Sequence, residues 1–169
     1  MTTTLILTRH AKSDWGKPGL RDFDRPLNKR GQMSAEAIGA WLSGKGYRPD
    51  EVVVSGAART METWQGIARG FAFVPPHRIE RDLYEASAET ILTVLRRATA
   101  PSVMLIGHNP GFADFASRIV TAPPDHSRFS DYPTCATTIM SFPRNRWNHT
   151  EWREAEVVDF VVPRDLIEV

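Results

Sequence analysis

Two histidines and two arginines in this sequence lie at or shortly after the ends of short apolar runs. They are Arg9, His10, Arg59 and His108. Short apolar runs bounded by polar residues are typical of buried strands, and ligands of α/β proteins bind where such strands end. His108 also precedes Asn109 and Pro110, which suit the start of a helix, and a helix N-terminus favours an anion. Because arginine binds phosphate through paired hydrogen bonds, these residues together predict a site for an anion.

A histidine in such a cluster can act as a nucleophile toward phosphorus. The neighbouring arginines disfavour protonation of an imidazole, so that one ring nitrogen keeps its lone pair. The arginines and the second histidine can hold the phosphoryl oxygens, and water would then hydrolyse the phosphohistidine that is formed. A carboxylic acid that protonates the leaving group would complete the site, and Glu85 is the candidate at the end of an element. The alternative for Glu85 is an acid that complements the dipole of the following helix.

Other site chemistries have less support in the sequence. The five histidines form neither an HExxH motif nor a Cys/His cluster, and an arginine beside His10 disfavours a bound cation. The sequence has no P-loop, no GxGxxG motif and no G-x-S-x-G segment around Ser55. We therefore expect neither a metal nor a cofactor.

The composition is that of an ordinary globular domain. The chain has 169 residues, of which 41% are hydrophobic and 24% charged, so we expect a single domain over residues 1–169. A net charge of +1 gives no overall electrostatic case for binding nucleic acid or a membrane surface. One cysteine, Cys135, cannot form an internal disulfide, and the N-terminal apolar run is too short for a signal segment. A cytoplasmic protein is the resulting expectation.

The elements that must position the candidate residues alternate between strand and helix. Strands are expected over 5–8, 52–55, 103–107, 137–142 and 156–162, with a short one within 78–83, and helices over 29–44, 58–69, 88–97 and 110–121. This alternation predicts a mainly parallel sheet with helices on both faces, and the closing pair of strands adds an antiparallel part. The predicted fold class is α/β, a three-layer α/β/α sandwich with a mixed sheet.

Two local expectations concern the segment between the first strand and the second. The loop over 13–28 carries several charges, which we expect to be solvated, except for Arg25 directly before the first helix. In that helix an apolar set at helical spacing is expected to face the core. The set is Met33, Ala37, Ile38, Trp41 and Leu42.

These motifs resemble those of a known family, the histidine phosphatase superfamily with its phosphoglycerate mutase-like fold. Arg9-His10-Ala11 after a strand resembles the Arg-His-Gly signature, and residues 55–60 resemble the Ser-x-x-x-Arg-Thr/Ala segment. Glu85 and Gly107-His108-Asn109 follow in the same order, so that the resemblance extends from residue 5 to about residue 120. The short length, together with residues 24–27 and 132–134, is similar to the SixA-type phosphohistidine phosphatases.

The resemblance implies a role for each candidate residue. It makes His10 the nucleophile, and Arg9, Arg59 and His108 the phosphate pocket. Arg25 would be an additional phosphate or substrate contact, and Glu85 matches the position of the proton donor. The sequence departs from the signature at Ala11, where the family usually has glycine; an alanine requires ordinary backbone angles there and adds one methyl group.

The leading interpretation is a metal-independent phosphatase that forms a phosphohistidine intermediate and dephosphorylates phosphohistidine in a protein. Its partner would be a phosphorylated protein such as a phosphohistidine domain. One alternative is a phosphatase for small phosphoesters with the same fold, and a second is a non-catalytic phosphate-binding regulatory module. A mutase is less expected, because the chain between Arg59 and His108 is compact, and an open site suits a protein substrate.

Overall fold

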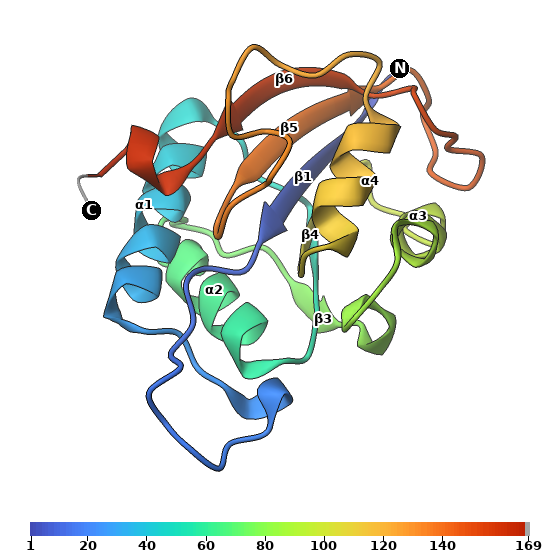
Figure 1. The fold of residues 1–169 in the computed structure, drawn as a ribbon. Helices are drawn as coiled ribbons and strands as arrows, with labels where there is room; N and C mark the ends of the chain where they lie inside the picture. The colour runs from blue at the N-terminus through green and yellow to red at the C-terminus, as the bar shows by residue number, and fades with distance from the viewer. Residues whose placement is uncertain (168–169) are drawn as a thin grey trace.

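The computed structural model describes residues 1–167 and arranges them around one six-stranded sheet (Figure 1). The strands are β1 (Thr3–Arg9), β2 (Glu51–Val54), β3 (His77–Ile79), β4 (Ser102–Gly107), β5 (Thr137–Phe142) and β6 (Glu156–Val161). The helices are α1 (Lys29–Lys45), α2 (Ala58–Ala68), α3 (Ala88–Arg96) and α4 (Gly111–Ile119), with short 3₁₀ turns η1 (Asp22–Asp24), η2 (Arg81–Leu83) and η3 (Pro163–Asp165). None of the helices in this described part is long and apolar enough to cross a membrane.

The strand order is β3-β2-β4-β1-β5-β6, which is a mixed sheet as the sequence predicts. The parallel pairs are β1 with β4, β4 with β2 and β2 with β3, whereas β5 and β6 are antiparallel to their neighbours. In the pairing of β1 with β4, Arg9 lies opposite Gly107. Because the carboxyl ends of parallel strands meet at one edge of a sheet, His10 and His108 follow at the same level.

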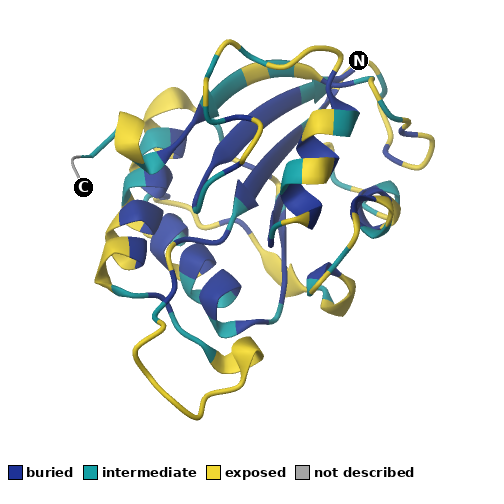
Figure 2. Cartoon of the chain, viewed as in Figure 1, coloured by how far each residue is buried: buried dark blue, intermediate teal, exposed yellow. Residues whose placement is uncertain are grey.

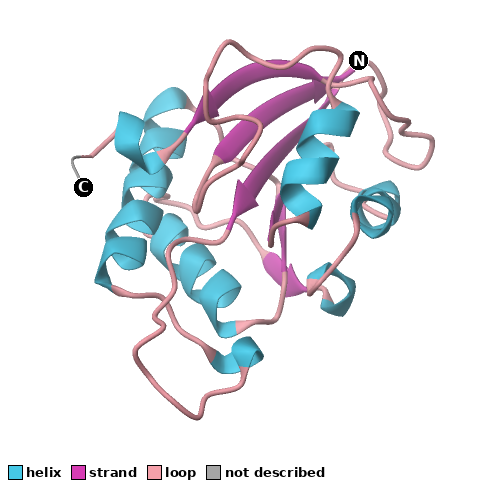
Figure 3. Ribbon diagram, viewed as in Figure 1, coloured by secondary structure: helices cyan, strands magenta, loops and turns pink. Residues whose placement is uncertain are grey.

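Helices cover both faces of the sheet, which confirms the three-layer architecture (Figure 3). Successive side chains of a strand point to opposite faces, and the two cores follow that alternation. Figure 2 shows that the central strands are buried along most of their length. Leu5 and Leu7 belong to the core beneath α3 and α4, whereas Ile6 belongs to the core beneath α1 and α2. β1 is therefore buried on both sides, so that the residues after it are held firmly.

One expected core face is partly wrong. Met33 of α1 is 50% exposed, whereas Ile38 and Leu42 are buried as predicted. The packed face of α1 is lined by small residues, because α1 and α2 approach closely. At Gly39 a Cβ atom would lie only 2.3 Å from the carbonyl oxygen of Ile67. A helix face that packs by close approach of two backbones need not carry the largest side chains.

The start of α4 also differs from the expectation. The helix begins at Gly111 rather than at Pro110, yet the side chain of Asn109 still accepts a hydrogen bond from the Ala113 amide at 3.1 Å. A Cβ atom at Gly111 would lie 2.0 Å from the carbonyl oxygen of Ala86. The backbone at Gly111 therefore lies very close to that of Ala86, so that the start of α4 packs directly against the segment that precedes α3.

Candidate active site

The two histidines lie together at the carboxyl edge of the sheet. His10 follows β1 and His108 follows β4, and their ring centroids are 5.4 Å apart. Both side chains are largely buried. The sequence prediction placed these residues at neighbouring strand ends, and the structure brings them into one site.

The ring of His10 is held in one orientation by its own neighbour. Nδ1 lies 2.7 Å from the carbonyl oxygen of Ala11, and because a carbonyl can only accept, Nδ1 carries the proton. Burial lowers the pKa of His10 to about 3; the bond to Ala11 opposes this shift in part, and the charge of Arg9 adds to it. The ring is therefore neutral at physiological pH, and Nε2 keeps its lone pair.

Alanine fits at position 11 without strain. Its φ is negative, its amide donates to Thr63 Oγ1 at 2.9 Å, and its methyl group belongs to the core beneath α1 and α2. Thr63 Oγ1 in turn donates to the carbonyl of Arg59 at 2.6 Å. The residue after His10 thus connects the end of β1 to α2.

Arg9 is oriented by a carbonyl from a distant turn. Its Nη1 donates to the carbonyl oxygen of Tyr132 at 3.2 Å, and Asn109 Nδ2 donates to the same oxygen at 2.9 Å. Tyr132 has a φ of 48°, in the left-handed region, and its buried hydroxyl donates to the carbonyl of Leu7 at 2.7 Å. This buried hydrogen bond fixes a backbone conformation that a tyrosine rarely adopts.

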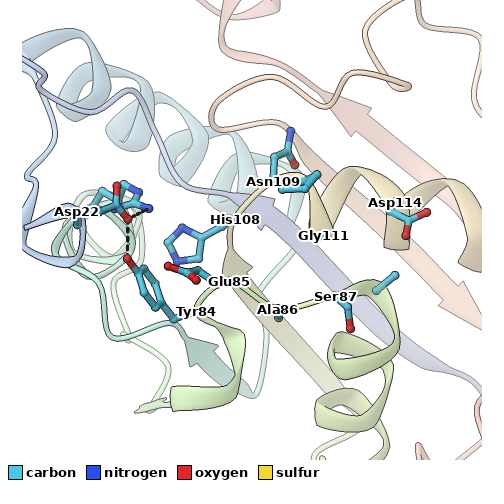
Figure 4. A pocket seen from close by; sticks show the side chains of 12 residues that line it. Asp22, Tyr84, Glu85, Ala86, Ser87, His108, Asn109, Gly111 and Asp114 are labelled. Carbon is cyan, nitrogen blue, oxygen red and sulfur yellow. Dashed lines mark hydrogen bonds and ion pairs between the residues drawn. The ribbon is translucent and has the colours of Figure 1, made fainter.

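Arg59 is buried at the start of α2 and binds Asp22. Its Nη1 donates to the Asp22 carbonyl at 2.8 Å and its Nη2 to the Asp22 carboxylate at 3.0 Å. Tyr84 donates its hydroxyl to the same carboxylate at 2.6 Å (Figure 4). The hydrogen bond from Tyr84, then that from Arg25, hold the pKa of Asp22 far below its usual range. Asp22 is exposed, as expected for this loop, but its carboxylate also binds Arg59 and Tyr84, which the sequence does not indicate.

Arg25 reaches the site through the same acid. Its Nη2 donates to the Asp22 carboxylate at 2.9 Å, its Nη1 donates to Ser13 Oγ, and its guanidinium lies 3.6 Å from the ring centroid of Trp15. Arg25 and Arg59 thus share one carboxylate. The structure places Arg25 beside the predicted phosphate pocket, where it is neighbour to Arg59 through Asp22.

His108 pairs with a serine that sequence reasoning did not single out as a site residue. Its Nε2 lies 2.8 Å from Ser55 Oγ, and Ser55 is fully buried. Burial, and then the charge of Arg59, lower the pKa of His108 to about 3. Val54 lies opposite Ile106 in the pairing of β2 with β4, so that Ser55 follows at the level of Gly107, one residue before His108. The alignment of these two strand ends is the feature from which the pair of Ser55 and His108 could have been predicted.

Several buried nitrogens around these residues have no hydrogen-bond partner within residues 1–167. They are the Nε atoms of Arg9, Arg25 and Arg59, and Nδ1 of His108. An arginine Nε can only donate, so three of these nitrogens are donors that no carbonyl or carboxylate of the described chain uses. An oxyanion has several acceptor oxygens and suits arginine donors.

Glu85 lines a pocket of about 530 Å³ that opens beside His108 and Arg59. Figure 4 shows Tyr84, Glu85 and His108 around this pocket. Glu85 is exposed, has a φ of 55°, and lies two residues before Ser87, the N-cap of α3. It therefore lies outside the first turn of α3, so that the helix-dipole alternative has less support than a position at the pocket.

Comparisons with known proteins identify the family of this chain. A family model described as the histidine phosphatase superfamily (branch 1) matches residues 5–93. An uncharacterized chloroplastic protein of Arabidopsis thaliana is 31% identical over 154 residues, which cover 85% of this chain and 68% of that protein.

Two solved structures are similar over nearly their whole length. A crystal structure of a candidate phosphohistidine phosphatase SixA from Agrobacterium tumefaciens has a TM-score of 0.76 and 32% identity, covering 95% of this chain and 98% of that one. A second candidate SixA, from Nakamurella multipartitia, has a TM-score of 0.80 and 26% identity, covering 96% and 97% of the two chains.

Proposed function

This chain belongs to the histidine phosphatase superfamily, branch 1, and on that premise we propose that it removes the phosphoryl group from phosphohistidine in a protein. Phosphatase activity follows from the family and from the SixA-type structures that it resembles. The substrate class and the intermediate on His10 are our proposal. The observation that carries it is the neutral His10 ring, held by Ala11 beside Arg9 and His108.

In the proposed first step, Nε2 of His10 attacks phosphorus and the bond from phosphorus to the leaving group breaks. The leaving imidazole takes up a proton from solvent and departs as a neutral ring, and the phosphoryl group is then bonded to His10. Arg9, Arg59 and His108 bind its oxygens, which is electrostatic stabilisation of the kind that phosphoryl transfer requires. In the second step a water attacks phosphorus, the bond to His10 breaks, and phosphate leaves with the ring restored.

The surroundings of the site support a protein substrate and a reaction without a metal ion. Two guanidinium groups and a third nearby, on Arg9, Arg59 and Arg25, supply positive charge that a cation would otherwise provide. Between α2 and β4 the chain contains only β3, η2 and α3 with short connections, so that no inserted domain covers the pocket. A cytoplasmic location is part of the same proposal.

The test is to trap the intermediate. The protein is mixed briefly with a histidine-phosphorylated protein or with a chromogenic phosphomonoester, and then denatured rapidly. We expect a base-stable, acid-labile phosphate on His10, and faster turnover of the phosphohistidine protein. His10→Ala should abolish both signals, whereas His149→Ala, an exposed histidine in the turn before β6, should not. Near-normal turnover by His10→Ala would contradict the mechanism, and a preference for the phosphomonoester would contradict the substrate class.

A further inference from the structure

A groove beside the site collects basic side chains from four parts of the chain. Lys12, Arg30, Arg128 and Arg164 line it, together with residues 133–134 and 162–163. We call it the basic groove; its volume is about 210 Å³. No carboxylate is among its lining residues in the described chain, although the whole protein has a net charge of only +1. Positive charge is therefore concentrated there.

The carboxylates nearest in sequence cancel only part of this charge. Asp131 pairs with Arg128 at 3.0 Å, which accounts for one of the four cations. Asp165 follows Arg164, but its carboxylate accepts from His126 at 2.9 Å and from the Val162 amide at 3.1 Å. Within residues 1–167, Lys12, Arg30 and Arg164 have no ion-pair partner.

The basic groove shares two segments with the active site. Lys12 comes two residues after His10, and a chain of two residues can separate their Cα atoms by at most about 7 Å. Residues 133–134 follow Tyr132, whose carbonyl holds Arg9, and precede Cys135, whose amide donates to the carbonyl of His10 at 3.0 Å. The third wall is the 3₁₀ turn η3, which lies beside α1 in Figure 1. The groove is therefore joined, through Lys12 and residues 133–134, to the segments that hold His10 and Arg9.

We propose that the basic groove binds an acidic segment of the phosphorylated partner protein. This inference rests on the proposed function and adds the chemistry of the surface that the partner presents. Arginine side chains bind carboxylates through paired hydrogen bonds, and charge pairs at the rim of an interface steer the encounter. A segment that carries Asp or Glu side chains would thus bring the phosphohistidine of its own protein toward His10.

A protein segment fits the groove better than a nucleic acid does. Nucleic-acid surfaces follow the phosphate backbone with a long basic track and use aromatic side chains to stack bases. The groove has four cations in about 210 Å³ and no aromatic lining residue among those described. The net charge of +1 gives no wider basic face to extend it.

The experiment reverses single charges at matched positions. Arg30→Glu changes the groove, and Arg146→Glu makes the same charge change at an exposed residue between β5 and β6. We measure kcat/KM for a histidine-phosphorylated protein with an acidic surface and for p-nitrophenyl phosphate, at low and high salt. Arg30→Glu should lower kcat/KM for the protein about tenfold at low salt and much less at high salt, because a rim charge acts on association. The small substrate should be turned over at the unchanged rate, and Arg146→Glu should behave as the unmodified chain.

Binding of an oligo-glutamate peptide keeps the inference separate from the proposed function. The labelled peptide should bind the unmodified chain and Arg146→Glu, and should bind Arg30→Glu and Arg164→Glu severalfold more weakly. Equal binding by all four proteins would overturn the inference even if the phosphatase is active. Displacement of the peptide by an RNA oligonucleotide at lower concentration than by free oligo-glutamate would also overturn it. Loss of turnover on every substrate with intact peptide binding would instead count against the proposed function alone.

Discussion

Arg59 makes two hydrogen bonds to Asp22, one to its carbonyl at 2.8 Å and one to its carboxylate at 3.0 Å. Two bonds from one guanidinium to one residue fix both the position and the plane of that group. The Arg59 side chain is 8% exposed and that of Asp22 50%, so that the acid holds the arginine from the solvent side. Asp22 is therefore a positioning residue for the predicted phosphate pocket, and it also balances part of the positive charge there.

Asp22→Asn tests both consequences of this contact. The substitution keeps the size of the side chain but removes the charge that Arg25, Arg59 and Tyr84 share. We expect kcat to fall about tenfold because the bond from Arg59 to the side chain of residue 22 loses its charge and holds the guanidinium less firmly, although the bond to the carbonyl remains. Inorganic phosphate should inhibit the variant more strongly, because a negative charge beside two arginines is gone. Steady-state kinetics with phosphate as inhibitor measures both quantities.

A neighbouring acid provides the control for that substitution. Asp24 lies in the same 3₁₀ turn and pairs with the exposed Arg21. Asp24→Asn should leave kcat and phosphate inhibition close to those of the unmodified chain. Weaker phosphate inhibition in Asp22→Asn would contradict the charge-balancing role, and equal losses in both variants would show a general effect of the turn.

Ser55→Ala tests how His108 is oriented. The hydroxyl lies 2.8 Å from His108 Nε2 in a fully buried position, so that its removal leaves a ring nitrogen unpaired. We expect a loss of about 1–3 kcal/mol in the free energy of unfolding, as for other buried polar groups that lose a partner. Vanadate, which resembles the transition state of phosphoryl transfer, should bind more weakly. Ser117→Ala, at an exposed serine on α4, should change neither the unfolding curve nor vanadate binding.

The buried His10 ring should make stability depend on pH. Its pKa is lowered from 6.5 to about 3 by burial and by the charge of Arg9, so that between these values the unfolded chain binds a proton that the folded chain does not. The contribution of His10 to the free energy of unfolding is therefore fully present above pH 6.5. It decreases as the pH falls toward 3, by up to about 1.4 kcal/mol per pH unit for this one group. When unfolding by denaturant is measured between pH 7 and pH 4.5, the free energy of unfolding should decrease less steeply for His10→Gln than for the unmodified chain. A decrease of unchanged slope would mean that His10 does not bear this linkage.

The fold and the central site residues were predictable because each rests on a local pattern. Strand ends are marked in the sequence by an apolar run that stops at a polar residue, and parallel pairing then brings Arg9, His10 and His108 to one edge. The mixed sheet follows from the same alternation of strands and helices. Nothing beyond the elements themselves is needed for these inferences.

The contacts that orient the site depend on how distant segments pack, which a single sequence does not reveal. Asp22 lies in a charged loop whose composition is that of solvated loops, yet that loop turns back onto Arg59. The carbonyl that holds Arg9 belongs to Tyr132, and any residue type could supply a carbonyl. Met33 is exposed because α1 packs through its glycines, and helical spacing alone does not distinguish the two faces.

Substitution of Glu85 by glutamine separates two classes of substrate. An alkoxide that leaves a phosphomonoester needs a proton in the transition state, and general acid catalysis contributes about 10²–10⁴-fold. An imidazole can be protonated before its bond to phosphorus breaks and needs that acid less. Glu85→Gln keeps the shape of a side chain that lines the pocket beside His108 and removes the acid. We therefore expect hydrolysis of an alkyl phosphomonoester to fall severely and hydrolysis of phosphohistidine to fall only slightly. Hydrolysis of p-nitrophenyl phosphate should also fall little, because p-nitrophenolate leaves without needing a proton.

Each other outcome for Glu85→Gln has its own physical meaning. A small and equal loss on both substrates would contradict a role as proton donor, and Glu156→Gln, at an exposed glutamate of β6, gives the size of such a non-specific effect. A large and equal loss on both would mean that Glu85 also activates the water that attacks phospho-His10. In that case the second step would become slow, and the phosphorylated His10 would accumulate. Rapid denaturation during turnover measures that accumulation directly, because it would be present in Glu85→Gln and low in the unmodified chain.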